Sequence, residues 1–195
     1  MNRTETLPFV ASLMIAAGLM GWIVWSQRPA EPVVASASPA SPLPPAPVPP
    51  APEPPPLDET RAAQLREAAE GAPDDVQARV DLGNLYFNSQ RFEDAIPWFE
   101  AALTLDPQAV DVSTDLAVAY FYLDDTERAL AQLARSLEVD PAHAQTILSL
   151  GIVRAFGNQD LDGAFEAWEE VLRVAPGSPE ASAAADAMDR LRAAH

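Results

Sequence analysis

The sequence contains no cysteine, no lysine and only two histidines. Without cysteine, the chain has no disulfide framework, no thiolate metal site and no thiol nucleophile. His143 lies near Pro141 and His195 is the last residue, so the histidines do not have the spacing of a metal-ligand pair. The sequence also lacks a glycine-rich phosphate loop and a nucleophile beside a base. It therefore predicts neither an enzyme nor a bound metal or cofactor.

Basic side chains are scarce as well. The chain has 12 of them, all arginine, against 29 Asp and Glu, which gives a net charge of −17. A protein this acidic repels phosphate backbones, so nucleic acid is not an expected partner. A basic segment of another protein is compatible with this charge.

Charged residues are absent from one long stretch near the N-terminus. Leu7 to Trp25 form 19 residues without a charged side chain. A helix of that length spans about 28 Å, close to the hydrocarbon thickness of a bilayer. Trp22 and Trp25 lie at one end of the stretch, where indole rings favour the membrane interface. Residues 1–28 are therefore predicted to be an N-terminal tail and transmembrane anchor.

The alternative for this stretch is a cleavable signal peptide with a cleavage site at Ala35-Ser36-Ala37. An anchor is favoured because the apolar run is longer than a usual signal-peptide core, and the small-residue motif lies well past its end. Arg3 and Arg28 flank the two sides almost equally, so the positive-inside rule does not fix the orientation. Since very short N-terminal tails usually stay in the cytoplasm, we expect the rest of the chain outside it.

Residues 29–56 form a proline- and alanine-rich segment in which 13 of 28 residues are proline. Proline fixes φ and removes backbone donors, so this composition predicts a disordered, extended polyproline-II linker rather than a packed core. Such a linker reaches on the order of 85 Å. Pro-x-x-Pro spacings also permit an SH3-type ligand, although a passive spacer is the favoured interpretation.

Beyond the linker, proline recurs at positions 73, 107, 141 and 176, at intervals of 34, 34 and 35 residues. A near-constant period of this length indicates a structural repeat. When the units are aligned on these prolines, small and large residues fall at matching positions. The first unit has Leu82, Gly83, Tyr86, Ala95, Phe99, Ala102 and Pro107; the second has Leu116, Ala117, Tyr120, Ala129, Leu133, Ser136 and Pro141; the third has Leu150, Gly151, Arg154, Ala164, Trp168, Val171 and Pro176.

This pattern resembles the tetratricopeptide-repeat (TPR) family from Val76 to Pro176. The resemblance implies an all-α, right-handed helical solenoid of antiparallel helix pairs, with repeats at about 76–107, 110–141 and 144–176 within a domain of residues 57–195. Leu57 to Glu70 and Pro179 to Ala194 read as flanking helices, the second being a capping helix at about 179–194. About eight helices are expected in all.

In TPR proteins the first helix of each pair lines a concave groove, and the resemblance therefore implies a partner-binding groove there. Its residues would be Gln77, Val80, Asn84, Phe87, Asn88, Asp111, Thr114, Val118, Phe121, Tyr122, Gln145, Leu148, Ile152 and Phe156. This set is apolar and aromatic with amide and acidic edges and no basic residue. It favours a peptide or helix with apolar anchors and positive charge over an acidic tail. The alternative is that the flanking helices fold over these side chains and bury them.

The expected function is that of a membrane-tethered adaptor that binds another protein. A narrower resemblance, in layout and in the stretches 164–172 and 176–180, is to the TPR subunits of bacterial cytochrome c maturation (haem lyase) machinery. It implies a single-pass protein of the bacterial inner membrane, with the TPR domain on the extracytoplasmic side and an apocytochrome segment in its groove. The alternative is a self-assembling structural protein that forms membrane-associated oligomers, which the Ala17-x-x-x-Gly21 spacing would support.

One segment admits two interpretations. Asn158, Asp160, Asp162, Gly163 and Glu169 match positions of an EF-hand calcium loop. The favoured interpretation is the turn of a TPR unit, in which the second helix starts near Leu161 with Asp160 as its N-cap. A calcium loop would delay that helix to about residue 166, so the point at which the helix begins separates the two.

Overall fold

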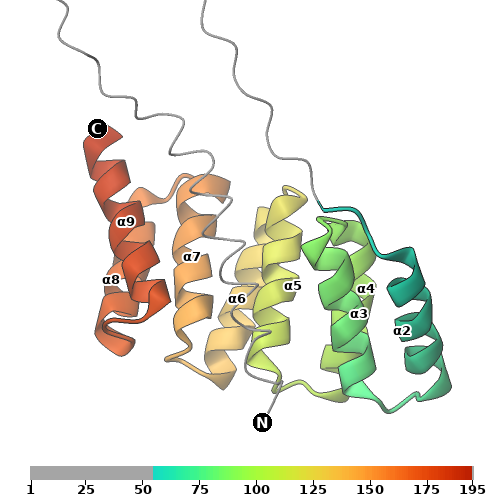
Figure 1. Cartoon of the computed structure of the whole chain (residues 1–195). Coiled ribbons are helices and arrows are strands. Elements are labelled where there is room, and N and C mark those ends of the chain that lie inside the picture. Colours follow the sequence, from blue (N-terminus) through green and yellow to red (C-terminus); the bar gives the residue numbers. More distant parts are fainter. Residues whose placement is uncertain (1–54, 195) are drawn as a thin grey trace, which may run out of the picture.

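The computed structural model of the chain describes residues 55–194. The predicted anchor, residues 29–54 of the proline-rich segment and His195 lie outside the described residues. Between residues 55 and 194 the chain is all-α, as predicted, and forms a row of eight helices (Figure 1). Their bounds are α2 Glu59–Gly71, α3 Val76–Asn88, α4 Phe92–Leu105, α5 Val110–Tyr122, α6 Thr126–Val139, α7 Ala144–Gly157, α8 Leu161–Val174 and α9 Pro179–Ala194.

Aspartate residues start several of these helices. The side chains of Asp58, Asp75, Asp125 and Asp160 each accept a hydrogen bond from the backbone N–H three residues later, at the starts of α2, α3, α6 and α8. Each such cap satisfies one of the N–H groups that the first turn of a helix leaves without a partner. The acidic composition of the chain is thus used in part to fix helix boundaries.

The turn inside each helix pair also has a recurring conformation. Gln90, Asp124 and Gln159 have φ values of 56°, 60° and 59°, in the turns α3–α4, α5–α6 and α7–α8. This left-handed conformation is uncommon for residues other than glycine. Its recurrence shows that the three pairs are built in the same way, including the third pair with its one extra residue.

The repeat signature residues form the core between the two helices of each pair. Leu82 and Phe99 are fully buried in the first pair, and Leu116 and Leu133 are at most 3% exposed in the second. Partly buried apolar residues surround this core along the whole row. The apolar positions of the sequence pattern are therefore the positions that hold each pair together.

In the third pair, a glycine leaves the space that a buried indole ring occupies. Trp168 of α8 is fully buried, and its indole N–H donates to the carbonyl of Leu148 at 3.3 Å. A Cβ atom on Gly151 of α7 would lie 2.2 Å from Nε1 of Trp168. The indole occupies the space that any larger residue at position 151 would need.

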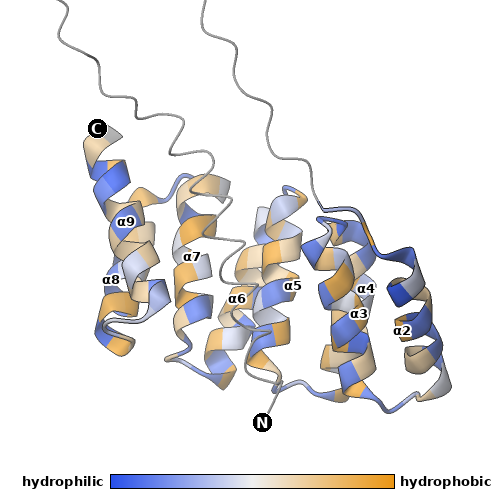
Figure 2. Cartoon of the chain, in the orientation of Figure 1, coloured by the Kyte–Doolittle hydropathy of each residue, from blue (hydrophilic) through white to orange (hydrophobic). Residues whose placement is uncertain are grey.

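Polar and apolar residues are mixed along every helix (Figure 2). This pattern suits helices that bury one face and expose the other. In the part of the chain that the structure describes, no helix is both long and apolar enough to span a membrane.

Candidate partner-binding groove

The helices α3, α5 and α7 lie side by side in one layer, and α4, α6 and α8 lie behind them (Figure 1). We call α3, α5 and α7 the first-helix layer. All of the predicted groove residues belong to it, but they differ in exposure. Gln77, Asp111, Tyr122 and Phe156 are exposed, and Val80, Asn84, Asn88, Phe121 and Gln145 are partly buried. Phe87, Thr114, Val118, Leu148 and Ile152, also predicted for the groove, are buried and do not line an open surface in this structure.

Packing within and between neighbouring repeats explains the buried positions. The ring of Phe87 contacts the rings of Phe92 and Phe99 in α4, with centroids 5.3 and 6.1 Å away. The hydroxyl of Thr114 lies 2.6 Å from that of Thr146 in α7. These side chains hold the array together and leave a smaller set for a partner.

Aromatic side chains gather at one end of the layer. Tyr122, the last residue of α5, and Phe156, the next-to-last residue of α7, occupy equivalent repeat positions and are 45% and 40% exposed. The ring of Tyr122 stacks on Phe92 at a centroid distance of 4.5 Å and lies 5.9 Å from Phe121. Burial raises the pKa of Tyr122, so its phenol stays neutral near pH 7. We call Phe92, Phe121, Tyr122 and Phe156 the aromatic strip.

Polar side chains occupy the opposite end of the layer. Asp111 near the start of α5 lies 3.0 Å from Nε2 of His143, the N-cap residue of α7. Nδ1 of His143 lies 2.7 Å from the hydroxyl of Thr146. Thr146 in turn contacts Thr114, which donates to the carbonyl of Val110 at 2.9 Å. A continuous hydrogen-bonded chain therefore connects α5 and α7.

Every contact in this series of hydrogen bonds has one donor and one acceptor when His143 is protonated. Both ring nitrogens then donate, to Asp111 and to Thr146, and each hydroxyl passes its own proton to the next acceptor. The hydrogen bond between the two residues raises the pKa of His143 and lowers that of Asp111. The pair therefore favours the charged forms of both residues and bridges neighbouring repeats.

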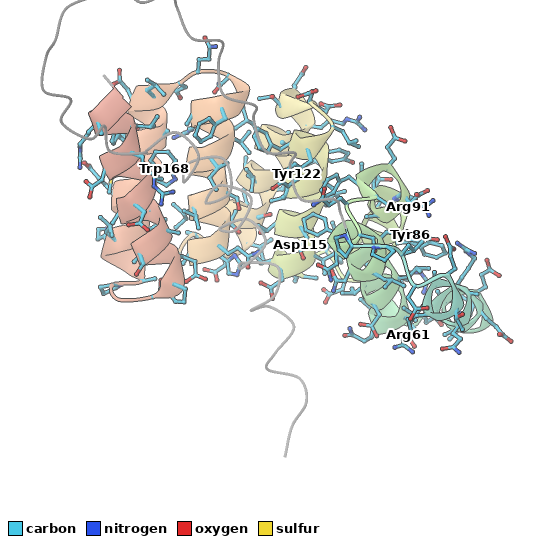
Figure 3. The ribbon with its side chains drawn as sticks, turned by 45° about the horizontal axis from the view of Figure 1, so that its top comes forward. Arg61, Tyr86, Arg91, Asp115, Tyr122 and Trp168 are labelled. Carbon is cyan, nitrogen blue, oxygen red and sulfur yellow. The ribbon has the colours of Figure 1, made fainter. Side chains whose placement is uncertain are left out.

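Asp115 is a further carboxyl group in this region, one turn after Asp111 on the same helix. It is only 8% exposed, and its Oδ1 atom has no hydrogen-bond partner. Burial, together with the charge of Asp111, raises the pKa of Asp115 to about 7. Tyr122 is the last residue of α5, and Asp115 lies near the middle of the same helix (Figure 3). Asp115 was not among the predicted groove residues, although its position one turn after Asp111 was a signal that could have included it.

The arginine side chains of the first-helix layer donate hydrogen bonds to backbone carbonyls. The layer has two arginines, Arg79 in α3 and Arg154 in α7. Arg79 donates to the carbonyls of Ala72 and Asp75, and Arg154 donates to the carbonyl of Gly163 at 2.9 Å. The layer thus combines an aromatic end with an acidic end that its own arginines do not neutralise.

The segment from Asn158 to Glu169, for which the sequence allowed a TPR turn or a calcium loop, adopts the TPR turn. The helix α8 begins at Leu161, and Oδ1 of Asp160 accepts from the backbone N–H of Gly163 at 2.9 Å. This confirms the predicted helix start and cap and is incompatible with a calcium loop, which would delay the helix. Over residues 55–194, no group of three or more His, Cys, Asp or Glu side chains is placed to hold a metal ion.

Comparison with known proteins gives the same class of protein as the fold. Two models described as tetratricopeptide repeat match residues 60–110 and 90–150. The chain is therefore a TPR-repeat protein whose described residues form a TPR array.

Two curated relatives share part of this array. The BBSome complex member BBS4 homolog of Drosophila melanogaster is 24% identical over 102 residues, which cover 52% of this chain and 21% of that protein. The photosystem I assembly protein Ycf3 of Prochlorococcus marinus (strain NATL1A) is 26% identical over 106 residues, which cover 46% of this chain and 61% of that protein. The chain thus spans less than two thirds of the length of either relative.

Solved structures show the same fold. A crystal structure of MamA has a TM-score of 0.56 and 24% identity, covering 60% of this chain and 67% of that chain. The first TPR domain of Spaghetti (RPAP3), bound to the HSP90 peptide SRMEEVD, has a TM-score of 0.51 and 23% identity. It covers 70% of this chain and 95% of that chain. At these identities the likeness establishes the architecture of the array.

Proposed function

We propose that this protein is a membrane-tethered adaptor whose first-helix layer binds a segment of a partner protein. The observation that carries the proposal is the exposure of Tyr122 and Phe156, 45% and 40%, at equivalent positions of neighbouring repeats. Stacking on Phe92 limits the freedom of the Tyr122 ring before any partner arrives. Rigid, exposed aromatic side chains lose little conformational entropy on binding and are typical anchors of protein interfaces.

The chemistry of the layer indicates the chemistry of the bound segment. The aromatic strip requires apolar anchors, and the carboxylates of Asp81 and Asp111 favour positive charge. The RPAP3 domain, which shares the fold, was solved with the acidic peptide SRMEEVD. Because both arginines of this layer donate to backbone carbonyls, we expect a basic segment here instead of an acidic tail.

The tether is the sequence prediction for residues 1–28, with the proline-rich segment 29–56 as its spacer. In this proposal the protein is a single-pass protein of the bacterial inner membrane with its TPR array outside the cytoplasm. The resemblance to haem lyase TPR subunits makes an apocytochrome c segment one candidate occupant of the groove. The array itself has no chemistry to perform in this role and acts by holding its partner near the membrane.

Photo-crosslinking in the native host tests the groove. A photoreactive aromatic amino acid replaces Tyr122 in the full chain, and captured proteins are identified by mass spectrometry. We expect one foreign protein, and we expect its yield to fall at least about tenfold when Phe156→Ala removes the neighbouring anchor. The matched control is Leu172→Ala, because Leu172 is 37% exposed but lies on α8 in the other layer.

Two results would contradict this proposal. If Phe156→Ala and Leu172→Ala reduce the yield equally, the captured protein does not bind the first-helix layer. If only peptides of the same protein are captured, the layer joins copies of the chain, and the self-assembling structural protein becomes the better description.

A further inference from the structure

One repeat position carries polar side chains in all three repeats. Asp81, Asp115 and Ser149 occupy the sixth position of α3, α5 and α7. Asp81 is partly buried and accepts a hydrogen bond from Gln77 at 2.7 Å. Asp115 and Ser149 are 8% and 2% exposed, and Oδ1 of Asp115 and Oγ of Ser149 have no hydrogen-bond partner. Two buried groups without partners therefore recur one repeat apart.

A buried carboxyl group without a partner destabilises a fold, because nothing replaces the water that it loses. None of the ion pairs among the described residues involves Asp115. The cation whose charge acts on Asp115 is His143, which is bound to Asp111. The group that would satisfy Asp115 is therefore not supplied by the described part of the chain.

Asp115 lies on the face of α5 that the proposed function assigns to the partner. Residues three or four apart share one face of a helix, so Asp111, Asp115, Val118 and Tyr122 form one line along α5. The side chain of Asp111 is 68% exposed at one end of this line, and Tyr122 is 45% exposed at the other. Asp115 thus lies just beneath the surface between them.

We infer that Asp115, with Asp111 beside it, is the subsite for an arginine or lysine side chain of the bound segment. The inference rests on the proposed function and names the contact that selects its partner. Arginine and lysine have long apolar stems that pack against a groove floor while the charged head reaches a carboxylate. A guanidinium or ammonium group then donates charge-assisted hydrogen bonds to the oxygen that has no partner in the free protein.

The subsite also determines the distance between the basic side chain and the apolar anchor of the bound segment. Asp115 and Tyr122 are separated by two turns of α5, which is about 10 Å along the helix axis. The bound segment therefore carries a basic side chain and an apolar anchor about 10 Å apart. Residues on opposite edges of a helix, or three residues apart in an extended strand, satisfy that distance.

Binding at this subsite is coupled to a proton. Since the pKa of Asp115 in the free protein is about 7, a large fraction of its carboxyl groups is protonated near neutral pH. A bound cation favours the carboxylate and lowers that pKa, so binding releases a proton below about pH 7. The charges that act on Asp115 are Asp111 and His143, and His143 in turn is faced by Asp140 and Glu180. Affinity should rise with pH up to about 7 and then level off.

A phage-displayed library of random peptides, selected at pH 8 on the full chain in detergent, supplies the probe. The selected peptide is synthesised, and its Kd is measured at pH 6, 7 and 8 with the wild type, Asp115→Asn and Tyr122→Ala. Glu138→Gln is the matched control, because it removes a negative charge from an exposed position of α6. A second peptide has its basic residue replaced by norleucine or citrulline.

We expect selected peptides to share a basic residue at a fixed distance from an apolar one. Asp115→Asn should weaken binding at pH 8 at least about tenfold and abolish the pH dependence. The affinity lost through Asp115→Asn and the affinity lost through the uncharged peptide should not be additive. The Glu138→Gln variant should bind the peptide within about twofold of the wild type. If Tyr122→Ala weakens binding while Asp115→Asn does not, Asp115 is not the subsite for the basic side chain, but the first-helix layer still binds the peptide. If neither substitution matters, the groove proposal fails with it.

Discussion

The carboxyl group of Asp115 has a pKa of about 7 in the folded chain, against 3.8 for an ordinary aspartate, because burial and Asp111 both disfavour its charged form. The folded chain therefore binds more protons than the unfolded chain between these values. The contribution of Asp115 to the free energy of unfolding should therefore fall as pH rises from about 4 to about 7 and be constant above that. The full difference is about 4 kcal/mol.

Asp115→Asn should therefore stabilise the array at pH 8, by up to about 4 kcal/mol, and have little effect at pH 4. Urea denaturation of residues 55–195 at both pH values measures the change. Asp81→Asn is the control, since Asp81 occupies the same repeat position, is only partly buried and is hydrogen-bonded to Gln77. A variant Asp115→Asn that is less stable than the wild type at pH 8 would show that the buried carboxylate has a partner.

Gly151 sets the distance between α7 and α8 at one contact. In Gly151→Ala, the new methyl group would lie 2.2 Å from Nε1 of the fully buried Trp168, so the indole or the helix must move. We expect a loss of about 2–4 kcal/mol in the free energy of unfolding, despite the better helix propensity of alanine. Gly71→Ala is the matched control, because nothing lies within 4 Å of its added Cβ. It should leave the stability unchanged or raise it by about 0.5 kcal/mol.

Among the helices, α8 depends on a cap that the sequence made visible. Asp160→Ala removes the hydrogen bond to the N–H of Gly163 and should lower the free energy of unfolding by about 1 kcal/mol. Asp162→Ala, in the first turn of α8 without a capping hydrogen bond, should lose at most about 0.5 kcal/mol. Thermal unfolding followed by circular dichroism, with and without millimolar calcium, measures both. Equal losses together with a calcium-dependent rise in Tm would contradict the TPR turn.

The helices could be predicted from the sequence because their determinants are local. The proline period, the paired Leu82 and Phe99, and the cap at Asp160 all act within one repeat, and the structure confirms the all-α array they predict. The first flanking helix begins at Glu59 after the cap of Asp58, two residues later than the apolar pattern suggested. That shift is a matter of capping, which the periodicity of apolar residues does not report.

The exposure of the groove could not be predicted in the same way, because it depends on contacts between elements. Phe87 is buried by Phe92 and Phe99 of the following helix. Thr114 is buried, and its hydroxyl forms a hydrogen bond with that of Thr146 in the next repeat. The TPR resemblance assigns both to the groove, since the repeat pattern contains no information about how the neighbouring helix packs. Asp115 was not predicted because the family pattern specifies groove positions only. It does not specify the polar repeat position that Asp81, Asp115 and Ser149 share.

At the scale of the whole molecule, the charge of the chain and the position of its aromatic strip act together. The chain has a net charge of −17, and the arginines of the first-helix layer are bound to backbone carbonyls. Long-range attraction would bring a basic segment towards the array, while Tyr122 and Phe156 would determine where it stays. Association should therefore slow with increasing salt, whereas loss of an aromatic anchor should mainly speed dissociation.

A membrane tether would add an effect that no contact in the array provides, because it confines the groove to a thin layer and raises its effective concentration for partners there. The 19 uncharged residues from Leu7 to Trp25 predict that the full chain stays in the membrane fraction after alkaline carbonate washing. Its intact mass should include residues 1–28, and protease added to spheroplasts should digest the array. A chain that starts at Pro29 is the control and should be released. A mature chain that begins at Ser38 in the released fraction would instead identify the stretch as a cleaved signal peptide, and the adaptor would then act on partners away from the bilayer.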